Sequence, residues 1–316
     1  MGVILQEVVA LRLVGGLGSQ LHKYCFGYAL ARELDVTLAL DLDWYKRRGQ
    51  EEAGRKRRDY LLDQFLISAT TSVPPLTKNV ASLQAKSFRY AKRLFGPQGS
   101  AESRKRLGKL FSKLGIVHFD FRDGETWQDV RSTLAKPVRY VSGEFGVDFS
   151  TFQHLRKDLQ DELSPVIPLS PLAREILRKI DRTNSIAVHV RRGDYLHGTY
   201  FSVQKPEYFS VAIDELIGSL SSPRVYLFSD DISWCEEILQ PRLGVNSTIV
   251  GNLTTYEDFQ LLSKARSLVI SNSGFSSMAA WLSSCDPRVV APKQWFSNQP
   301  INEIQLASLP LEWSLR

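Results

Sequence analysis

The amino-acid sequence predicts an α/β protein made of two Rossmann-like domains that face each other across a cleft. Two observations lead to this fold class. The first 45 residues read as strand, loop, helix and strand, which is a βαβ unit and implies a parallel sheet. A second series of strands and helices occupies residues 185–292, at roughly 20 to 40 residues per strand, which suits an open doubly wound sheet.

The N-terminal βαβ unit is defined by its apolar pattern. Residues 8–14 form the first expected strand, residues 15–19 a glycine-rich turn and residues 36–43 the second strand. The expected helix covers residues 20–35, because its apolar side chains recur at close to the helical period: Leu21, Tyr24, Cys25, Tyr28 and Leu34.

The second half of the chain alternates between short apolar runs and helices. The expected strands are residues 185–190, 224–229, 247–251, 267–271 and 288–292. The expected helices include residues 206–218, 232–239 and 255–266, the last with the Thr254–Glu257 spacing of a capping box. Three prolines within residues 163–171 mark a domain boundary. We therefore expect domains at residues 1–165 and 166–316, with a C-terminal segment that can pack back on the first domain.

Composition and charge narrow the class of protein. The 316 residues carry a net charge of +6 at pH 7 and are 43% hydrophobic, which is enough apolar material for a large core. A positive excess suits anionic partners: nucleic acid, nucleotide phosphates or an acidic membrane surface. The three cysteines lie far apart, which argues against a disulfide framework and a structural zinc site and favours a reducing cytosol. The apolar N-terminus has no basic region before it and no long apolar run follows, so we expect neither a signal peptide nor a membrane span.

A strongly basic stretch separates the two halves. Residues 86–113 hold nine Lys and Arg residues against one acid, Glu102. Within this stretch, residues 103–115 are expected to place Leu107, Leu110, Phe111 and Leu114 on one helical face. Two interpretations stay open: a solvated helix that packs on its own domain, or salt-sensitive adsorption to an anionic membrane, with Leu107, Leu110 and Phe111 in the interface. The cations of that surface would be Arg104, Lys105, Arg106, Lys109 and Lys113.

Residues 189–195, HVRRGDY, place two arginines and an aspartate directly after the first strand of the second domain. In open α/β sheets, ligands bind beyond the carboxyl ends of the strands. The planar guanidinium group matches phosphate oxygens two at a time, so Arg191 and Arg192 predict a site for a phosphorylated ligand. Because neighbouring side chains of an extended chain point to opposite sides, one arginine can face the ligand while the other secures the site. An internal ion pair of either arginine with Asp194 is the alternative.

Two further strand ends of the second domain carry polar groups. Asp230 and Asp231 follow the strand at residues 224–229, where a carboxylate can accept hydrogen bonds from a guanine edge or cap the next helix. In residues 270–282, small hydroxyl side chains lead into an apolar helix, whose first N–H groups can hold a phosphate. The alternative there is a helix cap alone.

The first domain offers two weaker signals. Residues 14–20, VGGLGSQ, are not a dinucleotide fingerprint, since Leu21 stands where a third glycine belongs, and not a Walker loop, since no Lys follows. Asp41 and Asp43 form an Asp-x-Asp after a strand, which can hold Mn²⁺ or Mg²⁺ under a nucleotide diphosphate, although aspartate at a strand end is common. The sequence contains no HExxH, GxSxG or Cys-His cluster, so metalloprotease and serine-hydrolase chemistry find no support.

Taken in order, these blocks resemble one family. Residues 13–31 (LVGGLGSQLHKYCFGYALA) are similar to its N-terminal block, and HVRRGDY matches the HxRRxDY signature of a fucosyltransferase superfamily. YFSVAIDEL…VYLFSDDISWC and YEDFQLLSKARSLVISNSGFSSMAAWL…VVAPKQWF match the remaining blocks. The chain thus resembles the bacterial-type galactoside α-1,2-fucosyltransferases of glycosyltransferase family 11. The resemblance covers the first 45 residues and most of residues 185–296.

This resemblance implies a GT-B-like fold and inverting transfer of L-fucose from GDP-fucose to the 2-hydroxyl of a terminal galactoside, with no metal and no other cofactor. It also implies O-antigen or similar surface-polysaccharide assembly, on a free or lipid-linked glycan, in the cytoplasm at the inner face of the membrane. By position, Arg191 and Arg192 would hold the diphosphate, and His189 with one of Asp230 and Asp231 would approach guanine. The remaining donor-site residues implied are Ser273, Phe275 and Ser276, with Gly16, Gly18 and Gln20 closing the cleft from the other domain.

The sequence departs from the family pattern at three places, of which residues 142–152 are expected to face the acceptor. SGEFGVDFSTF (142–152) replaces a common GYWQSEKYF, Ser19 replaces the usual Asn, and SGFSSMAAW replaces a common SSFSWWGAW. Arg191 is expected to stabilise the leaving phosphate, while the base stays open among Asp194, Glu144, Asp148 and His154. Two classes compete: a metal-dependent nucleotide-sugar transferase that uses Asp41 and Asp43, and a non-catalytic nucleotide-binding protein. A nucleic-acid binder is not expected, because no recognition motif accompanies the basic stretch.

Overall fold

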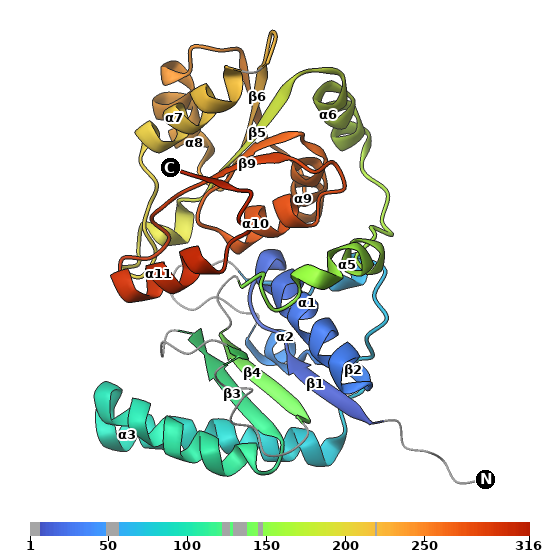
Figure 1. The fold of residues 1–316 in the computed structure, drawn as a ribbon, viewed down its shortest axis with the longest axis vertical. Coiled ribbons are helices and arrows are strands. Elements are labelled where there is room, and N and C mark those ends of the chain that lie inside the picture. Colours follow the sequence, from blue (N-terminus) through green and yellow to red (C-terminus); the bar gives the residue numbers. More distant parts are fainter. Residues whose placement is uncertain (1–6, 49–56, 122–126, 129–137, 145–147, 219) are drawn as a thin grey trace, which may run out of the picture. The chain divides into compact units, whose positions relative to one another are not determined.

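The computed structural model describes residues 7–48, 57–121, 127–128, 138–144, 148–218 and 220–316. Contacts divide the chain into two compact units (Figure 1). The first comprises Met1–Val14, Lys23–Gln50 and Ser68–Phe152, and the second Gly15–His22, Glu51–Ile67 and Gln153–Arg316. The glycine-rich turn therefore groups with the second unit, although it lies near the N-terminus. The boundary expected at residue 165 stays a prediction.

The first unit contains a four-stranded parallel sheet in the order β2-β1-β4-β3. Its strands are β1 (Val8–Arg12), β2 (Thr37–Asp41), β3 (Ile116–Asp120) and β4 (Tyr140–Glu144). The helix α1 (Leu17–Leu34) connects β1 to β2, which confirms the predicted βαβ unit. The short α2 (Asp43–Arg48) follows β2, and α3 (Pro75–Ser112) precedes β3.

One part of the core of this unit lies between its sheet and α3, and the buried residues of α1 pack on the sheet as well. Ala10 of β1 and Ala39 of β2 leave room for larger side chains, and Phe111 of α3 packs with them and with Tyr140. Phe111 is 6% exposed, whereas its neighbour Leu110 is 58% exposed. The prediction of one apolar face that includes both is wrong, because adjacent helical residues point about 100° apart and Phe111 takes the core side. Phe111 is therefore unavailable to a membrane.

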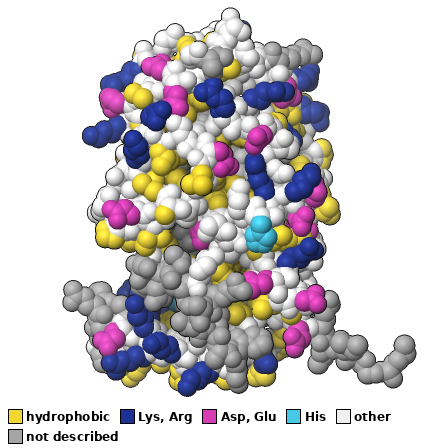
Figure 2. Space-filling view, in the orientation of Figure 1, with side chains coloured by type: hydrophobic (Ala, Val, Ile, Leu, Met, Phe, Trp, Pro, Cys, Tyr) yellow, Lys and Arg dark blue, Asp and Glu magenta, His cyan; other side chains and the backbone are white. Residues whose placement is uncertain are grey.

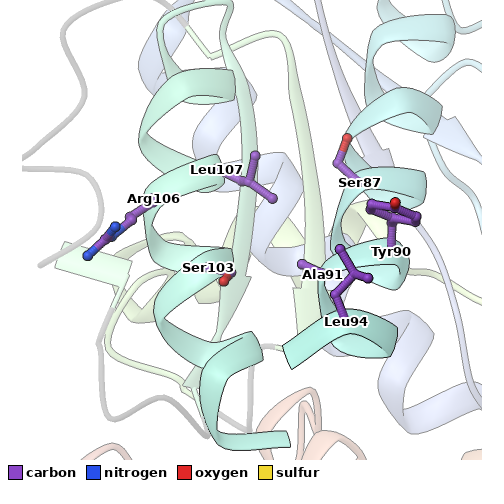
Figure 3. A pocket seen from close by; sticks show the side chains of 7 residues that line it. All are labelled: Ser87, Tyr90, Ala91, Leu94, Ser103, Arg106 and Leu107. Carbon is purple, nitrogen blue, oxygen red and sulfur yellow. The ribbon is translucent and has the colours of Figure 1, made fainter. Parts of the chain in front are cut away.

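The long helix α3 has two arms that lie side by side (Figure 3). Ser87 and Leu107 both line one cavity, although residues 20 apart on a straight helix would be separated by about 30 Å. The cavity has a volume of about 460 Å³. Its lining residues are Ser87, Tyr90, Ala91 and Leu94 of the first arm and Ser103, Arg106 and Leu107 of the second.

The second unit contains a six-stranded parallel sheet in the order β10-β9-β8-β5-β6-β7. From β5 the chain builds outward through β6 and β7, and then returns to the other side of β5 to build β8, β9 and β10. The order reverses between β5 and β8, which is the topological switch point where open α/β sheets bind ligands. The strands are β5 (Ser185–Val190), β6 (Arg224–Ser229), β7 (Ser247–Val250), β8 (Ser267–Val269), β9 (Arg288–Ala291) and β10 (Ser314–Leu315).

Helices cover both faces of this sheet (Figure 1). On one face, Val188 of β5 packs with α7 (Pro206–Ile217) and with the π-helical turn Cys235–Leu239 that follows α8 (Ile232–Trp234). Alternate side chains of β5 reach the other face, where the His189 ring meets Phe275 of α10 (Gly274–Trp281) and Phe275 meets Phe259 of α9 (Thr255–Lys264). Among the described residues, this unit also contains α5 (Arg156–Glu162), α6 (Pro171–Arg182) and α11 (Gln299–Ala307), with 3₁₀ turns at Leu62–Gln64, Gln153–Leu155, Gly193–Tyr195 and Gln240–Arg242.

The predicted α/β fold with two Rossmann-like parallel sheets is confirmed. All seven predicted strands form, and their ends differ from the expected ones by at most two residues. The capping box on α9 is present: Glu257 N–H donates to Thr254 Oγ1 at 3.2 Å, and Thr254 N–H donates to Glu257 Oε2 at 3.0 Å. Cys25, Cys235 and Cys285 are free cysteines, the first two of them buried. The C-terminal residues join the second sheet through β10, which pairs with β9.

Candidate active site

Three aspartates hold the two arginines that follow β5. Arg191 Nη1 lies 2.8 Å from Asp230 Oδ2, and its Nη2 lies 2.6 Å from Asp194 Oδ1. Arg192 Nε lies 3.1 Å from Asp231 Oδ2. The ion pair with Asp194, considered as an alternative from the sequence, is thus present for Arg191. The same guanidinium also binds a carboxylate of the next strand end, so the network joins two loops.

The two arginines point to different sides. The Arg192 guanidinium lies 4.1 Å from the centroid of the Trp234 ring, and Trp234 packs in turn on Phe209 of α7. The Arg191 guanidinium lies 5.6 Å from the Tyr195 ring. A guanidinium group that lies over an aromatic ring is stabilised by a cation–π interaction in addition to its ion pairs. Arg192 therefore has the closer aromatic contact, whereas Arg191 makes the two shorter ion pairs.

Hydrogen bonds tie the loops after β5, β6 and β8 to one another. Arg191 N–H donates to Ser271 Oγ at 3.0 Å, and the Ser271 hydroxyl donates to the carbonyl of His189 at 2.7 Å. Arg192 N–H donates to Asp230 Oδ1 at 2.9 Å. A Cβ atom at Gly193 would lie 2.7 Å from Asp230 Oδ2, so a side chain there would displace the Asp230 carboxylate. The switch point is thus built from three loops whose geometry is mutually fixed.

His189 is a buried, neutral imidazole beside these loops. Its ring lies 5.2 Å from the Phe275 ring, and its Nδ1 atom is buried with no hydrogen-bond partner among the described residues. Burial, together with the positive charge of Arg191, lowers the pKa of His189 to about 3. The ring is therefore neutral at neutral pH. Buried polar atoms normally have partners, so an unpaired ring nitrogen here favours a ligand group as the partner.

The start of α10 lies against the glycine-rich turn. Ser273 caps the helix, since its Oγ accepts a hydrogen bond from Phe275 N–H at 3.3 Å. Ser276 is fully buried and donates to the carbonyl of Ser273 at 3.4 Å. A Cβ atom at Gly18 would lie 2.3 Å from Phe275 N, so only glycine allows the turn to approach this closely. The structure therefore brings Gly18, Ser273, Phe275 and Ser276 together.

Gln20 fixes the glycine-rich turn by bonds to the backbone. Its buried amide donates to the carbonyls of Gly15 at 3.1 Å and Asp59 at 2.8 Å, and accepts from Leu61 N–H at 2.9 Å. Both amide hydrogens are thereby used, which leaves little capacity for a ligand. Gln20 joins the turn to the segment that contains Arg58.

The carboxylates of the Asp-x-Asp pair are occupied by the protein itself. Tyr140 OH donates to Asp41 Oδ2 at 2.6 Å, and Lys78 Nζ lies 2.8 Å from Asp43 Oδ1 and 3.9 Å from Asp41 Oδ1. Burial and the Asp41 charge raise the pKa of Tyr140, which keeps it a donor. A lysine between two carboxylates repels a divalent cation. Across the part of the chain that the structure describes, no group of three His, Cys, Asp or Glu could hold a metal ion. The metal-dependent alternative is not favoured.

The acceptor-side candidates differ in their surroundings. Glu144, at the end of β4, has a side chain 47% exposed, and its Oε2 lies 3.8 Å from Nζ of the buried Lys23. Asp148 closes a turn: its Oδ1 accepts from Ser150 N–H at 2.9 Å and from the Ser150 hydroxyl at 2.6 Å. His154 is exposed in a 3₁₀ turn of the second unit, whereas Glu144 and Asp148 belong to the first.

Two charged groups of the second unit were missed from the sequence. Arg58 Nη2 lies 3.7 Å from Asp194 Oδ2. Asp258 precedes Phe259 on α9, and its carboxyl has no hydrogen bond or ion pair among the described residues. Burial, and to a smaller extent the Glu257 charge, raise the pKa of Asp258 to about 7. An acid in the first turn of a helix is ordinary, so the sequence carried no signal for Asp258.

The site places guanidinium groups at the switch point of a parallel sheet, next to a neutral buried imidazole. This arrangement is typical of α/β proteins that bind a phosphorylated nucleoside, and the fold and the site together indicate that class of protein. The sequence model of glycosyl transferase family 11 matches residues 129–315. The match covers more than half of the chain, so the chain belongs to glycosyl transferase family 11 and is a glycosyltransferase. The resemblance predicted from its motifs is confirmed.

Two relatives span almost the whole chain. An alpha-1,2-colitosyltransferase of Escherichia coli is 28% identical over 97% of this chain and 98% of its own length. The O-antigen biosynthesis glycosyltransferase WbnK of Escherichia coli is 25% identical over 94% and 97%. The galactoside alpha-(1,2)-fucosyltransferase 2 of Mus musculus is 25% identical over 55% of each chain. Among solved structures, NodZ alpha-1,6-fucosyltransferase soaked with GDP-fucose covers 90% of this chain and 94% of its own, at 14% identity and a TM-score of 0.49.

Proposed function

We propose that this glycosyltransferase moves L-fucose, with inversion, from GDP-fucose to the 2-hydroxyl of a terminal galactoside during the assembly of a bacterial surface polysaccharide. The observation that carries the proposal is the network of Arg191 and Arg192 at the switch point of a family 11 chain. The names of the relatives, which describe α-1,2 transfer and O-antigen biosynthesis, support the linkage and the setting.

Departure of GDP is the step that the arginines are proposed to assist. When the bond between the sugar and the β-phosphate oxygen breaks, the electron pair stays on that oxygen. Preorganised guanidinium groups stabilise the growing charge without a metal or other cofactor. Arg192 is held in place by Trp234 and Asp231, so Arg191 is the arginine proposed to exchange carboxylate contacts for phosphate oxygens.

The nucleoside is proposed to bind on the α9 and α10 side of β5. His189 there is neutral and offers an unpaired buried ring nitrogen to the guanine. Asp230 and Asp231 both bind arginines, so the one that approaches guanine must use a remaining lone pair. Ser273 and Phe275, at the start of α10, are proposed to line the phosphates and ribose, with Ser276 supporting the helix end.

The acceptor hydroxyl must lose a proton as it attacks the sugar. Among the four candidates we favour Glu144 as the base. Its carboxyl is half exposed beside a buried lysine, whereas Asp148 is used to close a turn and the two oxygens of Asp194 face arginines. His154 is exposed and stays the alternative.

A second donor is supported by one comparison. The relative that is 28% identical over nearly the whole chain is named a colitosyltransferase. Colitose lacks the 3-hydroxyl of fucose, and a site that hydrogen-bonds a hydroxyl strongly rejects the analogue without it. Assays with GDP-fucose and GDP-colitose in parallel therefore decide the sugar.

The test of the proposed function is GDP release from GDP-fucose across galactose-terminated oligosaccharides, with and without EDTA, followed by NMR of the product linkage. We expect GDP release that depends on acceptor, persists in EDTA and gives an α-1,2 product. A strict need for Mn²⁺ or Mg²⁺ would move the chain to the metal-dependent class. GDP binding with no turnover on any acceptor would support a nucleotide-binding protein.

The surface of α3 suits an anionic membrane. Lys and Arg side chains gather at the lower edge of Figure 2, where Figure 1 shows α3. The exposed apolar side chains of α3 include Leu83, Tyr90, Leu94 and Leu110, which are 56%, 65%, 58% and 58% exposed. The cavity between the arms adds an apolar recess beside Arg106 (Figure 3). Exposed apolar side chains within a basic surface are typical of helices that lie in the headgroup region.

We propose that this surface gives the enzyme a peripheral, salt-sensitive contact with the cytoplasmic face of the membrane, close to a lipid-linked glycan. The cations are those expected from the sequence, Arg104 to Lys113, whereas the apolar set is Tyr90, Leu94 and Leu110 in place of Leu107, Leu110 and Phe111. Among the helices described, none is both long and apolar enough to cross a bilayer.

A further inference from the structure

A third arginine, Arg58, lies beside the site at the carboxyl ends of the strands of the second sheet. Arg58 Nη2 lies 3.7 Å from Asp194 Oδ2, and Arg191 Nη2 lies 2.6 Å from the other oxygen, Asp194 Oδ1. Asp194 thus lies between two guanidinium groups that come from segments more than 130 residues apart in the sequence. The Arg58 side chain is 35% exposed, so it is partly buried and still open to solvent.

The glycine-rich turn holds Arg58 in this place. A Cβ atom at Gly16 would lie 3.8 Å from Arg58 Cδ and 3.9 Å from its Nε, so the side chain runs along the turn at van der Waals distance. Gln20 of the same turn binds the backbone of Asp59 and Leu61, which follow Arg58 closely in the chain. The turn that packs on the start of α10 therefore also carries the segment of Arg58.

We propose that Arg58 is a third phosphate-binding residue of the donor site, and that Asp194 is a positioning residue that holds Arg58 and Arg191 rather than the catalytic base. This inference rests on the proposed GDP-sugar function. Each oxygen of Asp194 faces a guanidinium group, at 3.7 Å from Arg58 and at 2.6 Å from Arg191, so the carboxylate is placed to hold two arginines rather than to meet an acceptor hydroxyl. The positive charges of three arginines balance the negative charges of three aspartates at this site. A diphosphate offers more acceptor oxygens than Arg191 and Arg192 alone can bind bidentately.

The first experiment compares Arg58→Ala with Arg57→Ala by calorimetric titration of GDP and of guanosine. Arg57 is a matched control because it adjoins Arg58 but is 66% exposed and pairs with Asp59 at 3.3 Å. A lost charge-assisted contact to phosphate should weaken GDP binding by on the order of tenfold or more in Arg58→Ala. Guanosine binding should stay the same, and Arg57→Ala should change neither affinity by more than about twofold. Arg58→Lys should restore part of the GDP affinity, because it keeps the charge but lacks the fork.

The outcomes separate this inference from the proposed function. A wild-type chain that binds no GDP would refute the proposed function itself. Tight GDP binding by the wild type, with Arg58→Ala no weaker than Arg57→Ala, would overturn the role of Arg58 alone. An equal loss of GDP and guanosine affinity in Arg58→Ala would show a structural role and would overturn it as well.

The role of Asp194 is tested by the pH profile of kcat in Asp194→Asn. A positioning residue lowers kcat at every pH and leaves the shape of the profile unchanged, because the base is elsewhere. Loss of the acidic limb of the profile in Asp194→Asn would identify Asp194 as the base and overturn this part of the inference. Melting curves of both variants confirm that the compared proteins are folded.

Discussion

Arg191 is the residue whose loss should affect turnover most, because it bridges two strand-end loops and faces the place proposed for the leaving phosphate. Removing one preorganised donor to a developing anion lowers kcat by on the order of 10²–10³-fold. We expect a fall of that size in Arg191→Ala, and only partial recovery in Arg191→Lys, which cannot form the bidentate contact. The measurement is kcat for GDP release at saturating donor and acceptor.

The control for this prediction is Arg224→Ala. Arg224 is an exposed arginine at the amino end of β6, away from the strand ends that carry the site. It should leave kcat within about twofold, as for most surface substitutions. If Arg191→Ala kept most of its activity, Arg192 would be the main phosphate ligand or the proposed function would be wrong.

Asp258 should make stability depend on pH. The pKa of its carboxyl is about 7 in the folded chain, against an ordinary value of 3.8. A carboxyl with a raised pKa favours the folded state while it is protonated, so this contribution is complete below about pH 4 and is lost as the pH rises through 7. Asp258→Asn removes the titration. The Tm of Asp258→Asn minus that of the wild type should therefore increase between pH 4 and pH 8.

The exposed Asp181 on α6 provides the comparison for Asp258. Asp181→Asn should change Tm little at either pH, as for most surface substitutions. A Tm difference for Asp258→Asn that does not change between pH 4 and pH 8 would contradict the assigned pKa.

The sequence could predict the residues of the site that follow strands. Arg191, Asp194, Asp230 and Asp231 each come directly after an apolar run, and the parallel sheet brings those strand ends together. Arg58 could not be predicted in this way. It lies in a polar segment with no periodic pattern, and its place depends on a contact with the glycine-rich turn.

Among the elements, α3 shows most clearly which structural features the apolar periodicity of a sequence can predict and which it cannot. The spacing of Leu107, Leu110, Phe111 and Leu114 indicated a helix at residues 103–115, and the helix is present but ends at Ser112; the spacing did not reveal the first arm or the reversal between the arms. Periodicity reports which residues share a face, and the partner of that face comes from the tertiary fold. Here the partner of Phe111 is the sheet, and the second arm leaves Leu110 in solvent.

The α3 surface predicts binding to anionic vesicles. The triple variant Lys105→Glu, Lys109→Glu, Lys113→Glu should weaken co-sedimentation with phosphatidylserine-containing vesicles by on the order of 10²-fold, since each cation near such a surface contributes about 1 kcal/mol. The wild-type binding should also fall as salt is raised. The affinity is measured at low and at physiological salt.

A variant of equal charge change serves as the control for α3. Lys205, Arg224 and Lys293 are exposed cations of the second unit, and replacing all three by Glu should leave vesicle binding largely unchanged. Equal losses in the two triple variants would mean that net charge, rather than α3, governs adsorption. Absence of wild-type binding at low salt would leave α3 as a helix that packs on its own unit.

At the scale of the whole molecule, the order of segments along the chain differs from their grouping in space. The prolines of residues 163–171 marked a boundary in the sequence, yet Gly15–His22 and Glu51–Ile67 group with the second unit. These two segments carry the glycine-rich turn and Arg58, so the N-terminal part of the chain contributes to a site built on the C-terminal sheet. A proline-rich stretch can indicate a linker between domains, but it cannot show which earlier segments of the chain group with the later domain.

Because that site is assembled from distant segments, a donor nucleotide should stabilise the folded chain as a whole. A ligand at about 100 times its Kd stabilises the native state by about 2.7 kcal/mol, which for a protein of this size is a rise in Tm of several degrees. We expect this rise with GDP and GDP-fucose, with and without EDTA, and a much smaller one with UDP. The preference for GDP over UDP follows from the contacts proposed for His189 and the Asp230–Asp231 pair, which bind the nucleobase rather than the phosphates. Differential scanning fluorimetry at matched nucleotide concentrations gives the comparison. Equal shifts with GDP and UDP would show that the phosphates alone are recognised and would refute the guanine assignment.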